Sequence, residues 1–413
     1  MILLFFIAIL IALETALCLV VNMQRRSISW LITGKDELPV FDPVALQKFI
    51  DSSFDPHLGW VRKPNSSGVE NGRKGKITFH VDSTGSRSHA NGKLTPVIAA
   101  FGDSYTFCRQ VEDDETWEAQ LSHREDFGVL NYGVGNYGID QGLLRYEGMT
   151  LPETVRVAVM GFVPETICRV QSYWKHYLEF GNTFAFKPRF VLGPEGQLVL
   201  HENLIRGKED FARLHEKLPE VRKIDAFYET KFRSHQFRFP YIFSLARNPL
   251  KQSALISAVA LRGAARAFGI SKPWLEDLPF ALVMRSNILN AHQLYRDTKS
   301  TELLKAIFLR FHETARSRGH IPLVLVMPQL MDLKLSKGLT APYQAFFRDL
   351  AQEMPVIDVT DKFNKAGFEK LYVNDQYGGH PSVEGNRLVA EEISAWLKNS
   401  DVNQWYKERT LSR

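Results

Sequence analysis

Hydrophobic residues from position 97 onward gather into short continuous runs, separated by mixed stretches long enough for helices. Continuous apolar strands that alternate with helices are typical of a parallel sheet covered on both faces. We therefore predict an α/β fold whose strands occupy five segments: 97–101, 129–130, 155–160, 321–327 and 355–359.

Residues 22–96 show a different pattern. From position 41 they are rich in Gly, Pro, Asn, Asp and Ser, which favour turns. One alternating stretch, 77–81, predicts a short strand. We interpret 22–96 as a turn-rich lead-in to the α/β core.

The third and fourth predicted strands are separated by residues 161–320. A connection between a strand and the next helix usually takes about 2 to 6 residues, so a structured insertion is expected. We place the core at 97–172 and 301–400, and an inserted subdomain at 173–300.

Residues 2–21 are apolar except at Glu14 and Thr15, and their number matches the thickness of bilayer hydrocarbon. The apolar residues favour insertion by about 4 to 8 kcal/mol, against a cost of about 3 kcal/mol for one acidic residue. We predict a transmembrane anchor. The alternative is a cleaved signal peptide, but a basic n-region and an A-x-A site are lacking. Arg25 and Arg26 after the span favour a cytoplasmic main domain.

Composition adds little to this picture. The 413 residues are 45% hydrophobic with a net charge of +5, which fits a folded protein and argues against one that coats nucleic acid. The three cysteines fit neither a disulfide framework nor a zinc motif. We expect no metal and no cofactor, because the chain lacks a Walker loop, a dinucleotide fingerprint after a strand and clustered histidines.

Charge is unevenly distributed. Residues 222–266 contain nine Lys and Arg and two acids, so this segment carries +7 and the remainder −2. Seven aromatic residues lie between Phe227 and Phe243. This mixture suits an interfacial membrane segment or an anionic polymer such as a polysaccharide. A solvated basic face over an aromatic core is the alternative. We take Lys231, Arg233 and Arg238 as candidate substrate-binding residues.

Three motifs carry chemistry. Ser104 follows the first strand in Gly102-Asp103-Ser104, at the strand edge where α/β folds bind ligands. Asn131–Gly138 is a glycine-containing loop after the second strand, where backbone N–H groups could approach a ligand. His380 lies on a glycine-rich loop before a C-terminal helix, with Asp375 as a candidate orienting group.

Together, GDSYTF, NYGVGNYG and GGHPSVEGNRLVAEEI resemble blocks I, II and V of the SGNH/GDSL hydrolase superfamily over residues 97–396. The resemblance implies a flavodoxin-like three-layer α/β/α fold and a Ser-His(-Asp) site acting on acyl esters. It also implies Ser104 as nucleophile, His380 as general base and Asp375 as the triad acid. The backbone N–H groups of Ser104 and Asn136 would form the oxyanion hole.

The chain departs from the family pattern at three positions. Asn136 replaces the usual oxyanion glycine. Thr166 takes the place of the block III asparagine, and because a hydroxyl can also donate, we take Thr166 as the third member of the oxyanion hole. The family's acid lies three residues before the histidine, where this chain has Tyr377. Either Asp375 reaches the ring, or the site is a Ser-His dyad in which a carbonyl orients the ring.

The sequence thus predicts a serine esterase acting on O-acyl groups of a carbohydrate or cell-envelope glycan. An O-acyltransferase with the same site and a non-catalytic glycan-binding scaffold are the alternatives. The segments FDPHLGWVRKPN and RVQSYWKHY are similar to membrane-anchored SGNH proteins of polysaccharide biosynthesis, which implies that 173–300 forms a lid or glycan platform. We expect a bacterial inner-membrane protein whose catalytic domain is extracytoplasmic on substrate grounds, despite Arg25 and Arg26. Its partners would be an acylated glycan or other small ester and the membrane, with no nucleic acid.

Overall fold

The chain divides into two compact units. Unit 1 comprises residues 1–49, 171–187 and 204–286, and unit 2 comprises 50–170, 188–203 and 287–413. The computed structural model describes residues 2–24, 38–72, 75–88, 94–179, 181–233, 238–336, 338–373 and 379–399. The inserted region predicted at 173–300 is shared between the units, because its segments 188–203 and 287–300 belong to unit 2.

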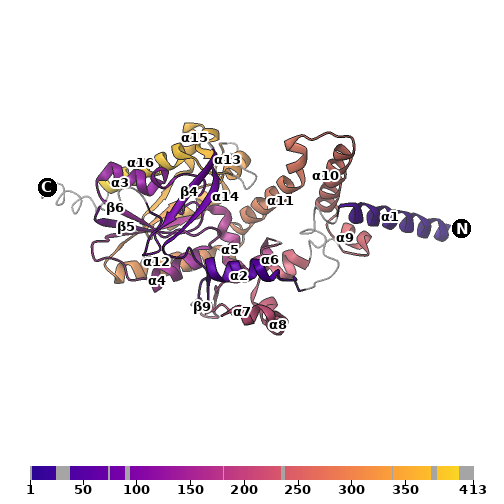
Figure 1. The fold of residues 1–413 in the computed structure, drawn as a ribbon, viewed down its shortest axis with the longest axis horizontal. Coiled ribbons are helices and arrows are strands. Elements are labelled where there is room, and N and C mark those ends of the chain that lie inside the picture. The colour runs from indigo at the N-terminus through magenta and orange to yellow at the C-terminus, as the bar shows by residue number, and fades with distance from the viewer. Residues whose placement is uncertain are drawn as a thin grey trace. The chain divides into compact units, whose positions relative to one another are not determined.

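Unit 2 is built on a five-stranded parallel sheet with the strand order β11-β10-β7-β5-β6 (Figure 1). If these five strands are numbered by their order in the chain and the sheet is read from β6 to β11, the order is 2-1-3-4-5. This is the flavodoxin-like arrangement. Each strand coincides with a predicted apolar run, so the parallel sheet is confirmed. The strands are β5 (Pro96–Phe101), β6 (Gly128–Asn131), β7 (Val157–Phe162), β10 (Ile321–Val326) and β11 (Val356–Asp358).

Helices cover both faces of this sheet, which confirms the three-layer α/β/α fold (Figure 1). The apolar side chains of β5, β7 and β10 alternate between two buried cores, because both faces are covered. One face packs against α3 (Trp117–Glu125), α13 (Leu330–Ser336), α15 (Thr360–Ala366) and α16 (Val383–Asn399). The other packs against α4 (Ile139–Gly148), α12 (Thr298–Ser317) and α14 (Pro342–Leu350).

Two-stranded antiparallel ribbons complete unit 2. The strand predicted at 77–81 is confirmed within β4, where Ile77, Phe79 and Val81 point alternately into the core. Its partner β3 was not predicted, because its sequence SSGVENG has the composition of a turn and becomes a strand by pairing with β4. The ribbons are β1 (Phe54–Asp55) with β2 (Gly59–Trp60), β3 (Ser66–Gly72) with β4 (Gly75–Val81), β8 (Arg189–Leu192) with β9 (Leu198–His201), and β12 (Tyr372–Val373) with β13 (His380–Pro381). Short helices also flank the sheet: α5 (Ile167–Gln171) and the 3-10 turns Asp113–Glu115, Pro164–Thr166 and Phe368–Leu371.

Unit 1 is mainly helical. The buried carboxylate of Asp225 holds two of its segments together, because it accepts the backbone N–H groups of Tyr173, Trp174 and Phe227. The helices found here are α1 (Ile2–Gln24), α2 (Pro43–Ser52), α6 (Lys175–Leu178), α7 (Lys208–Ala212), α8 (Leu214–Ile224), a π-helix (Tyr228–Arg233), α9 (Tyr241–Arg247), α10 (Pro249–Ala267) and α11 (Pro273–Leu294); α2 and α11 extend into unit 2.

Helix α1 is long and apolar enough to cross a bilayer, with a mean hydropathy of 2.8 over its most apolar window. Most of its side chains are exposed, but Leu17 and Val21 pack against Val259 of α10. Arg25 and Arg26, which bear on orientation, lie outside the described residues.

Candidate active site

Ser104 lies just beyond the carboxyl end of β5, the strand at which the order of the sheet reverses. Such a switch point is where open α/β sheets bind ligands. Gly102 makes the sharp exit from the strand with φ 153°; a Cβ there would lie 2.3 Å from Thr106 Oγ1. Asp103 then closes the turn, because its side chain accepts the N–H of Tyr105 at 2.9 Å. The local sequence thus presents the Ser104 hydroxyl at the sheet edge.

His380 reaches the same place from the other end of the chain. It begins β13, which pairs with β12 so that His380 lies opposite Val373. Tyr105, the neighbour of Ser104, donates its hydroxyl to the carbonyl oxygen of Gly379 at 2.5 Å. As a result, His380 Nε2 lies 3.0 Å from Ser104 Oγ, and both residues are buried, with exposures of 6% and 8%.

The second ring nitrogen of His380 contacts Gln110. Nδ1 lies 3.0 Å from Gln110 Oε1, and the amide nitrogen of Gln110 donates to the carbonyl oxygen of Asn71 at 3.2 Å. This second bond sets the direction of the amide, so Oε1 is the acceptor and Nδ1–H the donor. Nε2 is then unprotonated and accepts the Ser104 hydroxyl, which is the tautomer that a general base needs. Asp375 and Tyr377 lie outside the described residues.

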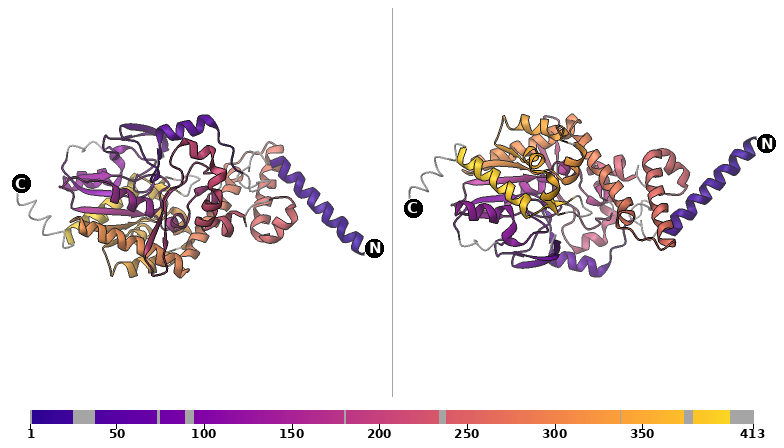
Figure 2. Two further views of the ribbon diagram at one scale, coloured as in Figure 1. Left: turned by 90° about the horizontal axis from the view of Figure 1, so that it is seen from below. Right: turned by 90° about the horizontal axis from the view of Figure 1, so that it is seen from above.

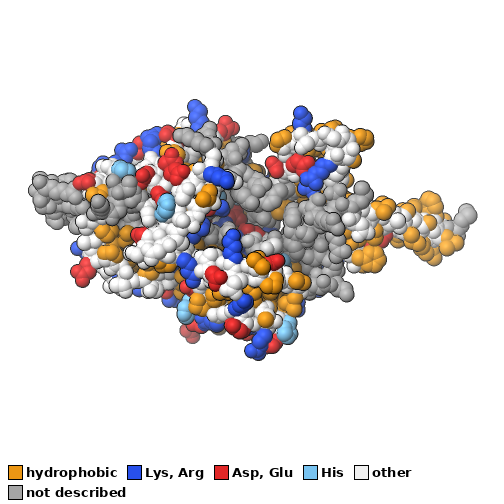
Figure 3. Space-filling model, in the orientation of Figure 1, with side chains coloured by type: hydrophobic (Ala, Val, Ile, Leu, Met, Phe, Trp, Pro, Cys, Tyr) orange, Lys and Arg blue, Asp and Glu red, His pale blue; other side chains and the backbone are white. Residues whose placement is uncertain are grey.

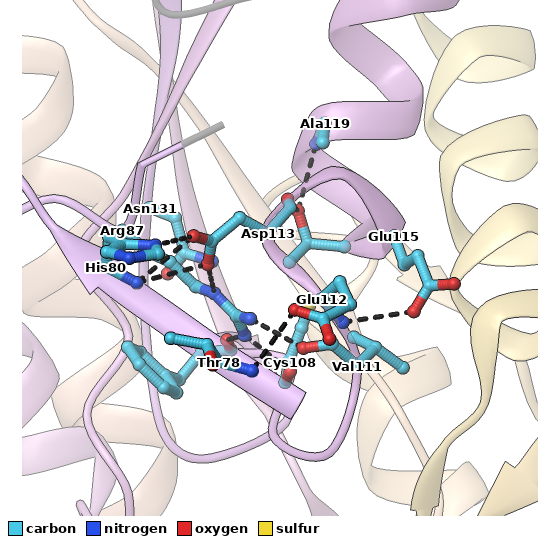
Figure 4. A network of polar contacts seen from close by, with 12 residues as sticks. Thr78, His80, Arg87, Cys108, Val111, Glu112, Asp113, Glu115, Ala119 and Asn131 are labelled. Carbon is cyan, nitrogen blue, oxygen red and sulfur yellow. Dashed lines mark hydrogen bonds and ion pairs between the residues drawn. The ribbon is translucent and has the colours of Figure 1, made fainter. Parts of the chain in front are cut away.

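Gln110 belongs to the loop 107–113. The buried side chain of Arg87 holds this loop in place through hydrogen bonds (Figure 4). Its guanidinium donates to the carbonyl oxygens of Phe107, Cys108 and Val111 at 2.6 to 2.7 Å. Its Nε also donates to Asp113 at 2.8 Å. These bonds hold the loop while Gln110 itself adopts a left-handed φ of 72°. Nothing in the local sequence marks Arg87 or Gln110 as part of the site.

The loop 131–137 forms the other wall beside Ser104. The amide of Asn131 donates to the carbonyl oxygen of Thr106 at 2.8 Å, and the N–H of Val134 donates to that of Gly102 at 3.0 Å. Gly133 permits this approach, since a Cβ there would lie 2.2 Å from the backbone nitrogen of Phe107. Asn136 follows on the exposed part of the loop with φ 70°.

Arg169 links the turn that carries Ser104 to the loop 131–137. Its guanidinium lies 3.6 Å from Asp103 Oδ2 and donates to the carbonyl oxygen of Tyr137 at 3.0 Å. Burial raises the pKa of the Asp103 carboxyl, while the charge of Arg169 acts in the opposite direction. Thr166, the third candidate for the oxyanion hole, donates its hydroxyl to the carbonyl oxygen of Val163 at 2.7 Å, within its own 3-10 turn. This bond engages the proton that an oxyanion would need.

Arg62 and Arg109 border the loop at Gly135, where a Cβ would lie 3.9 Å from the side chain of each. Arg109 donates to both oxygens of Glu70 at 2.9 and 3.0 Å, and Arg62 lies 3.5 Å from the same carboxylate. Because two guanidinium groups share one carboxylate, this cluster carries a net positive charge. Arg109 also donates its backbone N–H to the carbonyl oxygen of Ser104 at 3.1 Å, so the charge lies close to the nucleophile turn.

The three candidate substrate-binding cations lie in unit 1, whereas Ser104 and His380 lie in unit 2. Lys231 donates to the carbonyl oxygen of Leu178 at 2.6 Å, and Arg233 pairs with Glu229 at 2.9 Å. The backbone of Arg238 bonds with the Ser244 hydroxyl. Within the described ranges, no group of three or more His, Cys, Asp or Glu side chains is placed to hold a metal ion.

No known family model and no curated protein matches the chain. Solved structures resemble it at low similarity, among them the following three. A putative lipolytic protein of the G-D-S-L family from Desulfitobacterium hafniense DCB-2 is 13% identical with a TM-score of 0.32, over 73% of this chain and 98% of that one. A member of the same family from Veillonella parvula DSM 2008 is 9% identical with a TM-score of 0.34, over 74% and 100%. TesA is 12% identical with a TM-score of 0.33, over 74% and 98%. Similarity this low supports neither a substrate nor a residue role for this chain.

Proposed function

We propose that the protein is a membrane-anchored serine esterase that removes O-acyl groups from a carbohydrate, with a cell-envelope glycan as the substrate class. The observation that carries this proposal is the contact of 3.0 Å between Ser104 Oγ and His380 Nε2. It joins residues from opposite ends of the core at the switch point of the sheet. A hydroxyl paired with an unprotonated imidazole nitrogen is an activated nucleophile.

In the proposed reaction, Ser104 Oγ attacks the carbonyl carbon of the ester while its proton passes to His380 Nε2. The tetrahedral intermediate collapses to an acyl-enzyme, and the leaving sugar oxygen takes the proton back from Nε2. Water then attacks the acyl group with His380 as base, which releases a carboxylic acid and restores Ser104. Gln110 holds the ring throughout, because Nδ1–H keeps its acceptor in each step.

The oxyanion would be bound by the backbone N–H groups of Ser104 and Asn136. Two observations support this pair: the loop carrying Asn136 is bonded directly to the nucleophile turn, and Arg169 bridges the two from the other side. Because the Thr166 hydroxyl is engaged with Val163, we assign it no donor role. Removal of a single oxyanion donor costs on the order of 10² to 10³ in rate, so two donors are enough for activity.

The packing of α1 supports an uncleaved anchor. Leu17 and Val21 are buried against Val259, and Glu14 accepts two backbone N–H groups of α9. Removal of 2–21 as a signal peptide would expose this apolar cluster and leave those N–H groups without their acceptor. We propose that the catalytic unit is extracytoplasmic, where an envelope glycan is found. We retain Lys231, Arg233 and Arg238 as glycan-binding candidates.

O-acyl transfer is a second candidate, and the burial of Ser104 and His380 favours it. A site that excludes water leaves the acyl-enzyme to a sugar hydroxyl. Hydrolysis and transfer share each step before the acyl group departs.

The proposal is tested by hydrolysis of p-nitrophenyl acetate and of an O-acetylated polysaccharide by the full chain in detergent. We expect Ser104→Ala and His380→Ala to lower kcat/KM by at least about 10³-fold and 10²-fold, because general-base catalysis alone contributes about 10²–10⁴. Ser122→Ala, which alters a buried serine of α3, is the control and keeps activity. Equal release by the wild type and both site variants would leave the scaffold alternative standing.

A further inference from the structure

Helix α10 is mainly apolar on its buried side, and it also carries large apolar residues on its exposed side. Its exposed side includes an outer stripe that recurs every three or four residues: Leu250, Ala254, Ser257, Leu261, Ala264 and Phe268 just past its end. Leu250 is 88% and Phe268 82% exposed, whereas Gln252 and Arg262 of the same helix are buried. A helix surrounded by water keeps its exposed side mostly polar, so the exposed Leu250, Leu261 and Phe268 call for an apolar environment.

The neighbour of α10 suggests what that environment is. Helix α1, the proposed membrane anchor, contacts α9 and α10 within unit 1 through Leu17, Val21 and Val259. Helix α10 crosses α1 rather than running beside it (Figures 1 and 2). If α1 follows the bilayer normal, α10 therefore lies along the membrane plane, which is the orientation of an interfacial amphipathic helix.

The contact between α1 and α9 has a polar centre. Glu14 Oε1 accepts the N–H of Tyr241 at 2.7 Å, and Oε2 accepts that of Ile242 at 2.9 Å. These N–H groups begin α9 and have no acceptor inside that helix. At 1.5 Å per residue, Glu14 lies about 10 Å along α1 from Val21, which is the depth that interfacial helices reach. Glu14, the acidic residue that interrupts the apolar span, thus supplies the acceptors for the first N–H groups of α9.

Exposed aromatic and basic side chains complete the surface. Phe239, Phe243 and Trp274 are each more than 60% exposed, at 64%, 72% and 63%. Arg247 lies before the outer stripe, and Arg266 and Lys272 lie at its other end, all exposed. Aromatic side chains favour the membrane interface, and cations favour anionic headgroups. Figure 3 shows hydrophobic side chains along α1 and on the lobe that contains α10.

We propose that α9 and α10 form a second membrane contact, in which the outer stripe lies in the headgroup and acyl boundary of an anionic bilayer and Glu14 of the anchor caps α9. This inference rests on the proposed role of α1 as an anchor, and it is independent of the ester chemistry in unit 2. The basic segment 222–266, which carries +7, would then contact lipid headgroups through α9 and α10, in addition to any glycan.

The test measures quenching of a fluorophore by lipids that carry a doxyl group near the top of the acyl chain. The full chain is reconstituted in vesicles of phosphatidylcholine and phosphatidylglycerol, and NBD is attached to one cysteine at a time. Native Cys18 reports on α1, because Cys108 and Cys168 are buried. Leu250→Cys and Leu261→Cys, each in a Cys18→Ser background, report on α10. Glu313→Cys, at an exposed position of α12 in unit 2, is the matched control in the same background.

We expect strong quenching at positions 18, 250 and 261, and at least threefold less at 313. Quenching at 18 with none at 250 and 261 would overturn the second contact while the anchor stands. No quenching at 18, 250 or 261 would overturn both, and equal quenching at 250 and 313 would show that α10 is not a specific contact. Ester hydrolysis by the same preparations shows separately whether the catalytic unit is intact.

A second variant tests the cap. Glu14→Leu makes the span more apolar, so the chain stays in the vesicles, but it removes the acceptor of the α9 N–H groups. We expect quenching at position 250 to fall at least twofold in Glu14→Leu and less in Glu14→Gln, which keeps one carbonyl oxygen. Unchanged quenching in Glu14→Leu would contradict the role of Glu14.

Discussion

At the scale of a single residue, Gln110 orients the ring of His380, the proposed general base. Its Oε1 accepts Nδ1–H of His380, while its amide nitrogen is held by Asn71. An amide fixes the tautomer as a carboxylate would, but it contributes no negative charge to the imidazolium that forms during the reaction. Gln110 is therefore a positioning residue whose effect can be separated from that of an acid.

We predict that Gln110→Ala lowers kcat for ester hydrolysis by about 10- to 100-fold with little change in KM, which is part of the 10²–10⁴ that general-base catalysis supplies. Gln110→Glu restores an acceptor for Nδ1–H, so it should recover most of the kcat that Gln110→Ala loses. Equal kcat in Gln110→Glu and Gln110→Ala would contradict the contact.

The sequence predicted Ser104 and His380, which lie in contact, but it did not predict the residues that hold them in place. Ser104 and His380 were found because each follows a recognisable strand or loop pattern. Gln110 was missed because its role depends on a left-handed backbone conformation and on Arg87, which bonds to three carbonyl oxygens of the loop. Such bonds between side chains and backbone over long sequence distances leave no local pattern.

At the scale of elements, α6 and the π-helix of unit 1 share an aromatic cluster around His176. Its ring lies 4.7 Å from that of Trp174 and 5.3 Å from that of Phe232. Its Nδ1 accepts the N–H of Gly181 at 3.1 Å. Burial lowers the pKa of His176 to about 4, so the ring is neutral in the folded chain at pH 7.

The unfolded chain binds a proton at His176 below about pH 6.5, whereas the folded chain binds it only near pH 4. The free energy of unfolding should therefore fall by about 3 kcal/mol from this residue as the pH drops from 6.5 to 4. Urea unfolding at pH 7, 5.5 and 4 measures this. We expect His176→Phe to have a lower free energy of unfolding than the wild type at pH 7, and we expect that free energy to change less with pH. His215→Asn, which alters an exposed histidine of α8, is the control. An unchanged slope in His176→Phe would contradict the prediction.

Elements were predictable where local sequence and tertiary environment agree. The five core strands are continuous apolar runs because helices cover both faces, and α1 is continuous because lipid is its expected surroundings. Strand β3 was missed because it owes its conformation to β4 rather than to its own residues. The outer stripe of α10 was missed because its small residues are unremarkable until the structure shows which side is exposed.

At the scale of the whole molecule, the candidate active site and the proposed membrane anchor belong to different units. Ser104, His380, Gln110 and Arg169 all lie in unit 2, whereas α1, α9 and α10 lie in unit 1. The charge follows the same division, since the +7 segment 222–266 is in unit 1. The uneven charge can be read from the sequence, but the sequence did not predict that 188–203 and 287–300 belong to unit 2, which contains Ser104 and His380.

The central claim is that Ser104 is a nucleophile activated by His380. It is tested most directly by treating the full chain with a fluorophosphonate and locating the adduct by peptide mass spectrometry. We predict one adduct, on Ser104, that is absent in Ser104→Ala and forms at least about 10²-fold more slowly in His380→Ala, because the base no longer removes the proton. An adduct on another residue, or equal rates in the wild type and His380→Ala, would contradict the account.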